Sequence, residues 1–121
     1  MSDLVGTCPK GFWEEWIAEG DAAGSQESGM QWSWYTGDRK AASLRRGDRF
    51  YVVAHGKLRG WAPVTDLLVN EELAGGTKWQ IIRQGNAVAC TIPEPIQGFR
   101  GLRVRWWKRE NEQPFENWRK P

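Results

Sequence analysis

Several residue types are scarce in this chain of 121 residues, and each scarcity excludes something. Two cysteines, Cys8 and Cys90, and one histidine, His55, form no local spacing motif for a zinc site. The longest apolar stretches, such as residues 51–54, are far shorter than the roughly 18 residues that a membrane helix needs. The N-terminus lacks a signal-peptide pattern. We therefore expect a cytoplasmic protein with reduced cysteines, no metal, no cofactor and no membrane contact.

Motifs of the common enzyme classes are also missing. The chain has no nucleophile elbow and no phosphate-binding glycine loop of the Walker or dinucleotide type. Cys8 precedes a predicted helix, whose N-terminus would favour a thiolate, but burial is the commoner state of such a cysteine. The sequence therefore favours a binding protein over an enzyme.

Tryptophan, by contrast, is abundant, with nine residues. Its flat apolar face either fills a core or stacks on a flat ligand. The net charge of +2 is unevenly distributed, because residues 1–30 are acidic whereas residues 31–60 and 91–121 are basic. Arginine near tryptophan indicates a nucleic-acid partner, RNA or DNA, because a guanidinium group pairs with phosphate or stacks on a base. Ordinary solvated faces are the alternative, since charges grouped in sequence need not cluster in space.

Hydrophobic periodicity predicts one domain made mostly of strands. Apolar alternation and short apolar runs predict strands at residues 4–8, 30–35, 49–55, 58–68, 79–83, 87–92 and 99–108. Helical spacing predicts a helix over residues 12–19, followed by a polar loop over residues 20–29. We expect an α+β fold, a small and mostly antiparallel β pseudobarrel with flanking helices.

Local signals also predict how some strands pair. Residues 49–55 and 58–68 should form an antiparallel hairpin, with a bulge or an edge position at Pro63. Residues 79–83 and 87–92 look like a second pair. The polar tail, residues 110–121, is expected to pack back through Phe115 and Trp118.

Residues 44–64 carry the most specific pattern in the chain. A Gly47-Asp48 turn precedes an apolar strand, and Gly60 lies in the returning strand. This segment resembles a hairpin of PUA-like domains, the group that includes the ASCH and EVE families. The resemblance implies a β pseudobarrel over about residues 4–107 that binds RNA or DNA. For an EVE-like member it also implies an aromatic pocket that reads a modified base.

The same resemblance provides an enzymatic alternative. Some ASCH members resemble small amidohydrolases of modified nucleosides that use a lysine, a threonine three residues later and a distant glutamate. Lys40 and Ser43 have this spacing, but serine replaces threonine and no glutamate can be assigned. A third hypothesis is a protein-interaction module whose exposed tryptophans contact another protein.

Candidate phosphate contacts lie around two predicted turns and on the last predicted strand. They are Arg39, Lys40, Arg45, Arg46, Arg103 and Arg105. Loops at the rim of a barrel commonly carry binding groups, and basic side chains there would contact the phosphate backbone.

Strand alternation selects the candidate base-stacking residues. In the last strand it predicts an outer face of Arg103, Arg105 and Trp107 and a core face of Leu102, Val104 and Trp106. In the returning hairpin strand it groups Lys57, Arg59 and Trp61 opposite Leu58, Gly60 and Ala62. Together with Trp34, which lies near a predicted loop, the stacking candidates are Trp34, Trp61 and Trp107. The predicted core tryptophans are Trp13, Trp16, Trp32, Trp79 and Trp106.

Overall fold

The computed structural model describes residues 3–9, 11–15, 31–70, 78–84 and 87–120. Its strands are β1 (Leu4–Thr7), β2 (Gln31–Thr36), β3 (Arg49–Ala54), β4 (Lys57–Asn70), β5 (Lys78–Gln84), β6 (Val88–Thr91), β7 (Leu102–Val104) and β8 (Gln113–Pro114). Two 3-10 helices, η1 (Arg39–Ser43) and η2 (Arg109–Asn111), accompany them. Residues 13–15 are helical, while the second half of the predicted helix, from Trp16 onward, and the whole 20–29 loop lie outside the described residues. None of the helices in these ranges is long and apolar enough to cross a membrane.

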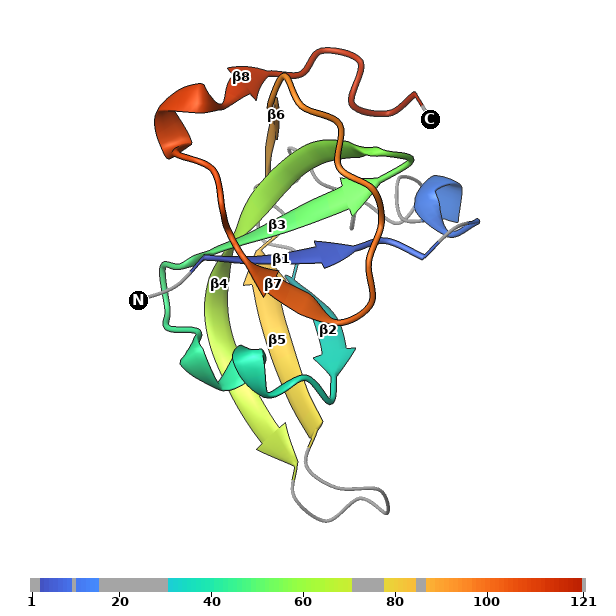
Figure 1. Cartoon of the computed structure of the whole chain (residues 1–121). Helices are drawn as coiled ribbons and strands as arrows, with labels where there is room; N and C mark the ends of the chain where they lie inside the picture. The colour runs from blue at the N-terminus through green and yellow to red at the C-terminus, as the bar shows by residue number, and fades with distance from the viewer. Residues whose placement is uncertain (1–2, 10, 16–30, 71–77, 85–86, 121) are drawn as a thin grey trace.

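A single curled sheet dominates the molecule (Figure 1). Its strands follow the order β2-β5-β4-β3-β1-β7, with β6 attached to β4 and β8 attached to β6. The pairings are antiparallel except between β1 and β3, which run parallel. The prediction of a small, curled and mostly antiparallel strand domain with few helices is therefore confirmed.

Strand β4 is fourteen residues long and connects the two halves of the sheet. Its first part pairs with β3 and with β6, and its second part, from Val64 onward, pairs with β5. The predicted pairing of residues 79–83 with residues 87–92 is therefore wrong. Both strands form, but each finds its partner along β4, because so long a strand has room for two neighbours on one edge.

The hairpin of β3 and β4 forms as predicted, with a turn at His55 and Gly56. Its bulge, however, lies at Arg59, because Val52 pairs with Gly60 whereas Val53 pairs with Leu58. One extra residue reverses the faces of the side chains on either side of it. The predicted grouping of Arg59 with Trp61 is therefore wrong, and Arg59 is buried instead.

Apolar side chains cover both faces of the central strands. A first cluster includes Leu4, Trp13, Ala41, Leu44, Phe50, Val52, Ala54, Val64, Trp79, Ile81, Leu102 and Trp118. A second cluster on the opposite face of the sheet includes Val5, Tyr51, Val53, Leu58, Cys90, Ile92, Ile96 and Trp107. Burial on both faces explains why residues 50–54 of β3 are apolar without interruption. The tail returns to the first cluster through Trp118, whose ring meets Trp13 edge to face with centroids 6.0 Å apart.

The last strand is shorter than residues 99–108, because the chain leaves the sheet after Val104. Side-chain alternation ends there, so Trp106 is 52% exposed while Trp107 is only 8% exposed. The predicted faces of these two tryptophans are therefore wrong. Val104 lies on the outermost strand and is exposed rather than part of the core.

Candidate functional site

Asp38 joins η1 to the start of β7. Its Oδ1 accepts the backbone N–H of Lys40 at 2.9 Å and caps η1, while its Oδ2 accepts the N–H of Leu102 at 2.8 Å. Gly101 has a φ of +69°, and a Cβ there would lie 2.6 Å from Asp38 Oδ2, so only glycine permits this close approach. Burial would raise the pKa of Asp38, but these hydrogen bonds outweigh it and lower the pKa. The link brings the basic residues of η1 beside those of β7.

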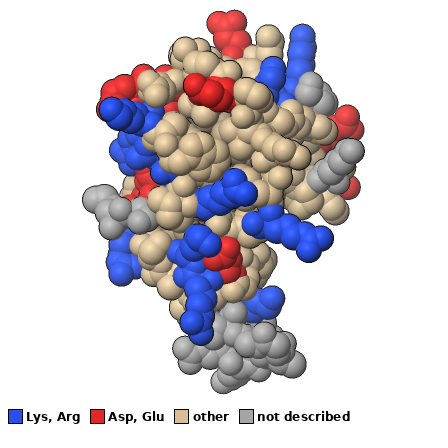
Figure 2. All heavy atoms as spheres, in the orientation of Figure 1, with Lys and Arg blue, Asp and Glu red and all other residues tan. Residues whose placement is uncertain are grey.

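Basic side chains consequently gather over η1 and β7 on one face of the molecule (Figure 2). Arg39, Lys40, Arg100 and Arg103 are all exposed. Within the described parts of the chain, no carboxylate lies within 4.0 Å of the three arginines, and Lys40 Nζ is 3.8 Å from Asp38. Three of the six predicted phosphate contacts thus meet at this junction, joined by Arg100, which sequence reasoning missed.

The other three predicted phosphate contacts have different surroundings. Arg105 donates to buried Asp3 at 3.1 Å and to the carbonyl oxygen of Trp107, so its guanidinium is engaged within the fold. Arg45 is exposed, but its guanidinium donates to the carbonyl oxygens that end η1. Arg46 is exposed in the turn before β3, apart from the junction.

Asp3 is a buried carboxylate on which donors from three residues converge. It accepts the backbone N–H of Arg49 at 2.9 Å, Nε of Arg105 at 3.1 Å and Nη2 of Arg109 at 2.7 Å. Burial alone would raise the pKa of Asp3, but the hydrogen bonds from Arg49, Arg109 and Arg105 lower it below its ordinary value. These arginine charges therefore stabilise the buried Asp3 carboxylate within the fold.

Glu112 is a second enclosed carboxylate, and it bonds directly to one of the predicted stacking residues, Trp107. It accepts Tyr51 Oη at 2.5 Å, Trp107 Nε1 at 2.9 Å and Arg49 Nη1 at 3.1 Å. The guanidinium group of Arg49 in turn lies 4.1 Å from the ring centroid of Trp61. Burial, together with the carboxylate, raises the pKa of Tyr51 above its ordinary value. Trp107 and Trp61 are thus engaged within the fold.

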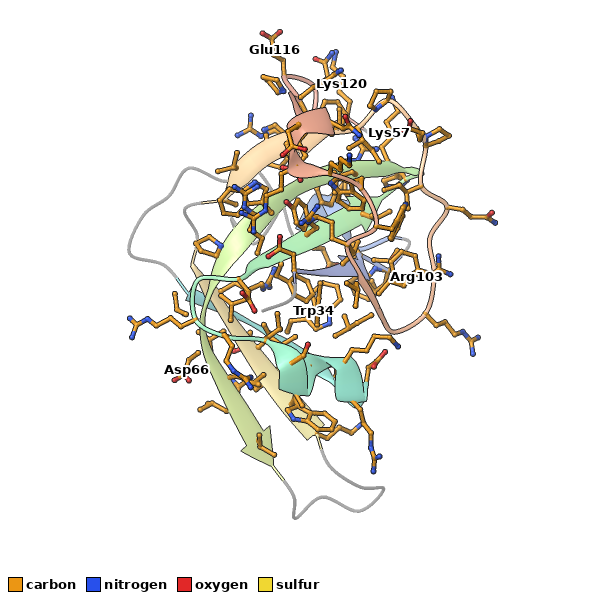
Figure 3. The ribbon with its side chains drawn as sticks, turned by 60° about the vertical axis from the view of Figure 1, so that its left-hand side comes forward. Trp34, Lys57, Asp66, Arg103, Glu116 and Lys120 are labelled. Carbon is orange, nitrogen blue, oxygen red and sulfur yellow. The ribbon has the colours of Figure 1, made fainter. Side chains whose placement is uncertain are left out.

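Trp34 lies inside the curl of the sheet (Figure 3). Its ring centroid is 4.8 Å from that of Phe50, and a Cβ on Gly6 would lie 2.8 Å from its Cζ2. Trp34 packs with the first cluster and Trp61 with the second, on opposite faces of the sheet. The predicted stacking pocket of Trp34, Trp61 and Trp107 therefore does not form.

The exposed aromatic surface is built instead from Trp106 and Phe99. Their ring centroids lie 6.2 Å apart at 67°, and the guanidinium of Arg103 lies 4.3 Å from the Phe99 centroid. Within the described ranges, nothing accepts a hydrogen bond from Trp106 Nε1. Strand alternation predicted that the two adjacent indoles would face opposite ways, but it assigned the exposed position to Trp107 instead of Trp106.

Lys40 and Ser43, the residues of the amidohydrolase hypothesis, lie at the two ends of η1. Ser43 Oγ donates to the carbonyl oxygen of Lys40 at 2.8 Å, a contact within the helix. Lys40 Nζ faces Asp38, which caps the same helix. This arrangement favours a structural role for the Ser43 hydroxyl.

The fold and the exposed residues together define a domain with a curled, mixed sheet and a basic, aromatic surface. No family model, no curated protein and no solved structure matches the chain.

Proposed function

We propose that this chain is a PUA-like domain and that it binds nucleic acid through a basic aromatic surface. That surface consists of Arg39, Lys40, Phe99, Arg100, Arg103 and Trp106. The observation that carries the proposal is the ring of Phe99, which contacts both the half-exposed indole of Trp106 and the guanidinium of Arg103, a charge without a carboxylate partner among the described residues. A flat apolar face next to unpaired positive charge complements a base and its phosphate.

The exposed tryptophan favours unpaired nucleotides as the ligand. Bases in a duplex are stacked on each other, so their faces are covered, whereas a base in a single strand can stack on Trp106. Such a contact contributes about 1–3 kcal/mol per base and tolerates every base, because each has a π face. An open platform does not enclose a base, so we expect weak dependence on base identity rather than reading of one modification.

The charges favour nucleic acid over a protein partner. Protein interfaces carry aromatic residues too, but lysine is depleted in them and their arginines commonly meet acidic groups. Here the cations are grouped around the end of β7 and lack acidic neighbours other than Asp38 in the described ranges. Binding to phosphates releases counterions, so the affinity should fall steeply as salt rises.

Fluorescence anisotropy with labelled single-stranded RNA, single-stranded DNA and a matched duplex tests the proposal. We expect the single strands to bind more tightly than the duplex. The slope of log affinity against log salt concentration should become shallower in Arg103→Gln, by about the loss of one phosphate contact. Trp106→Ala should weaken binding at every salt concentration. Lys120→Gln, which removes an exposed positive charge that is not part of this surface, serves as the control and should bind normally. Absence of binding to all three nucleic acids at low salt would overturn the proposal.

A further inference from the structure

A separate pocket lies next to the turn between β3 and β4. It has a volume of about 330 Å³ and is lined by Lys57, Thr91, Ile92, Pro93, Glu94, Pro95 and Phe115. Figure 3 shows Lys57 at the same end of the molecule as Glu116 and Lys120, remote from Asp66. This volume is near the lower end of the range for ligand pockets, about 300–1,000 Å³, so a small molecule fits it.

The wall of the pocket is held in place by the backbone. Ile96 donates its N–H to the carbonyl oxygen of Gly56 at 2.9 Å, which ties residues 92–96 to the hairpin turn. Pro93 and Pro95 restrict the backbone between them, because the proline ring fixes φ. A preformed wall lowers the entropic cost of binding a ligand.

Two opposite charges line the pocket without pairing. The ammonium of Lys57 is 5.9 Å from the ring centroid of Phe115 and has no carboxylate within 4.0 Å in the described ranges. Glu94 likewise has no cationic partner there. Because Pro93 and Pro95 lack N–H groups, the wall around Glu94 offers mainly acceptors: carbonyl oxygens and the carboxylate. Ile92 and Phe115 add apolar surface to the lining.

We propose that this pocket binds a free amino acid with an apolar side chain. Its carboxylate would face Lys57, its ammonium would face Glu94 and its side chain would lie on Phe115. A zwitterion complements both charges at once, whereas a nucleotide phosphate would meet one lysine and be repelled by Glu94. The pocket shares no residue with the basic aromatic surface, so the inference stands or falls independently of nucleic-acid binding.

Titration of the ¹⁵N-labelled full chain with three ligands tests each charge separately. The ligands are leucine, leucinamide, which lacks the carboxylate, and N-acetylleucine, which lacks the ammonium. We expect leucine to shift the amide signals of Lys57, Thr91 and Glu94 and to bind about threefold more tightly than either analogue, the size of an exposed ion pair. Lys57→Gln should abolish the preference for leucine over leucinamide, and Glu94→Gln the preference over N-acetylleucine.

Lys120→Gln, at the same end of the molecule, is the control and should retain both preferences. All three substituted side chains are exposed, so we expect each variant to fold. A dispersed amide spectrum checks this. Equal binding of the three ligands, or no saturable shift with leucine, would overturn the inference. A preference for leucine over leucinamide that survives in Lys57→Gln would overturn it too.

Discussion

The indole rings of Trp106 and Trp107 lie 5.0 Å apart and almost perpendicular, at 85°. Trp107 is buried and donates its Nε1 hydrogen to Glu112, whereas Trp106 presents half of its surface to solvent. The exposed ring contacts both the buried ring of Trp107 and the ring of Phe99. Two neighbouring tryptophans therefore serve opposite purposes, one in the core and one at the candidate binding surface.

Alanine substitutions should separate these two purposes. Trp107→Ala removes a buried ring and leaves Glu112 without one of its donors, so we expect a loss of about 3–5 kcal/mol in the free energy of unfolding. Trp106→Ala should cost under about 1 kcal/mol, because the ring is half exposed. Urea denaturation followed by circular dichroism measures both. Equal destabilisation by the two substitutions would show that Trp106 is a core residue.

The Asp3 carboxylate should make stability depend on acidity. Its pKa in the folded protein lies below the ordinary 3.8, so the charged form favours folding. This contribution is complete above about pH 4 and is lost as the pH falls below 3.8 toward the folded value. We expect Asp3→Asn to destabilise the protein at pH 7 and to weaken the dependence of the free energy of unfolding on pH in this acidic range. Asp66→Asn, at an exposed position, is the control, and an equally flat profile in both variants would contradict the prediction.

Arg59 should hold the C-terminal tail against the sheet. It is 1% exposed, and its guanidinium donates to the carbonyl oxygens of Ala54, Trp118 and Lys120 rather than to any carboxylate of the described residues. Arg59→Met preserves much of the volume but removes these donors, so we expect a loss of about 2–3 kcal/mol.

Limited proteolysis of that variant measures the release of the tail, which we expect to be cleaved near residues 113–120. Arg46→Met, a substitution of an exposed arginine, provides the comparison. A tail that stays protected in Arg59→Met would show that the packing of Trp118 on Trp13 holds it without Arg59.

Cys90 should be unreactive while the protein is folded. Burial, reinforced by the charge of Glu112, raises the pKa of this thiol to about 12, so almost no thiolate forms at neutral pH. We expect alkylation by iodoacetamide to proceed only through unfolding, so that its rate rises with urea. Rapid modification in the absence of denaturant, detected by mass spectrometry, would contradict this expectation.

The local parts of the fold follow from periodicity and turn residues. The β3–β4 hairpin, the Gly47-Asp48 turn and the strands β1, β2, β5 and β6 all lie close to their predicted positions. The partners of β5 and β6 do not follow from sequence, since pairing depends on the edge that β4 presents. The bulge at Arg59 lies next to Gly60, an isolated glycine of the kind that often marks a bulge, but the prediction placed the bulge at Pro63 instead.

The candidate site also depends partly on the sequence alone and partly on the tertiary structure. The sequence by itself determined that arginines and tryptophans are concentrated in a strand-rich domain, and that Arg39, Lys40 and Arg103 are polar residues of turns and edges. Tertiary structure alone decided that Asp38 and Gly101 bring η1 against β7, and that Trp106 rather than Trp107 reaches the surface. The physical reason is that a side chain's face depends on where its strand ends. β7 ends at Val104, where the chain turns to bury Trp107 beside Glu112.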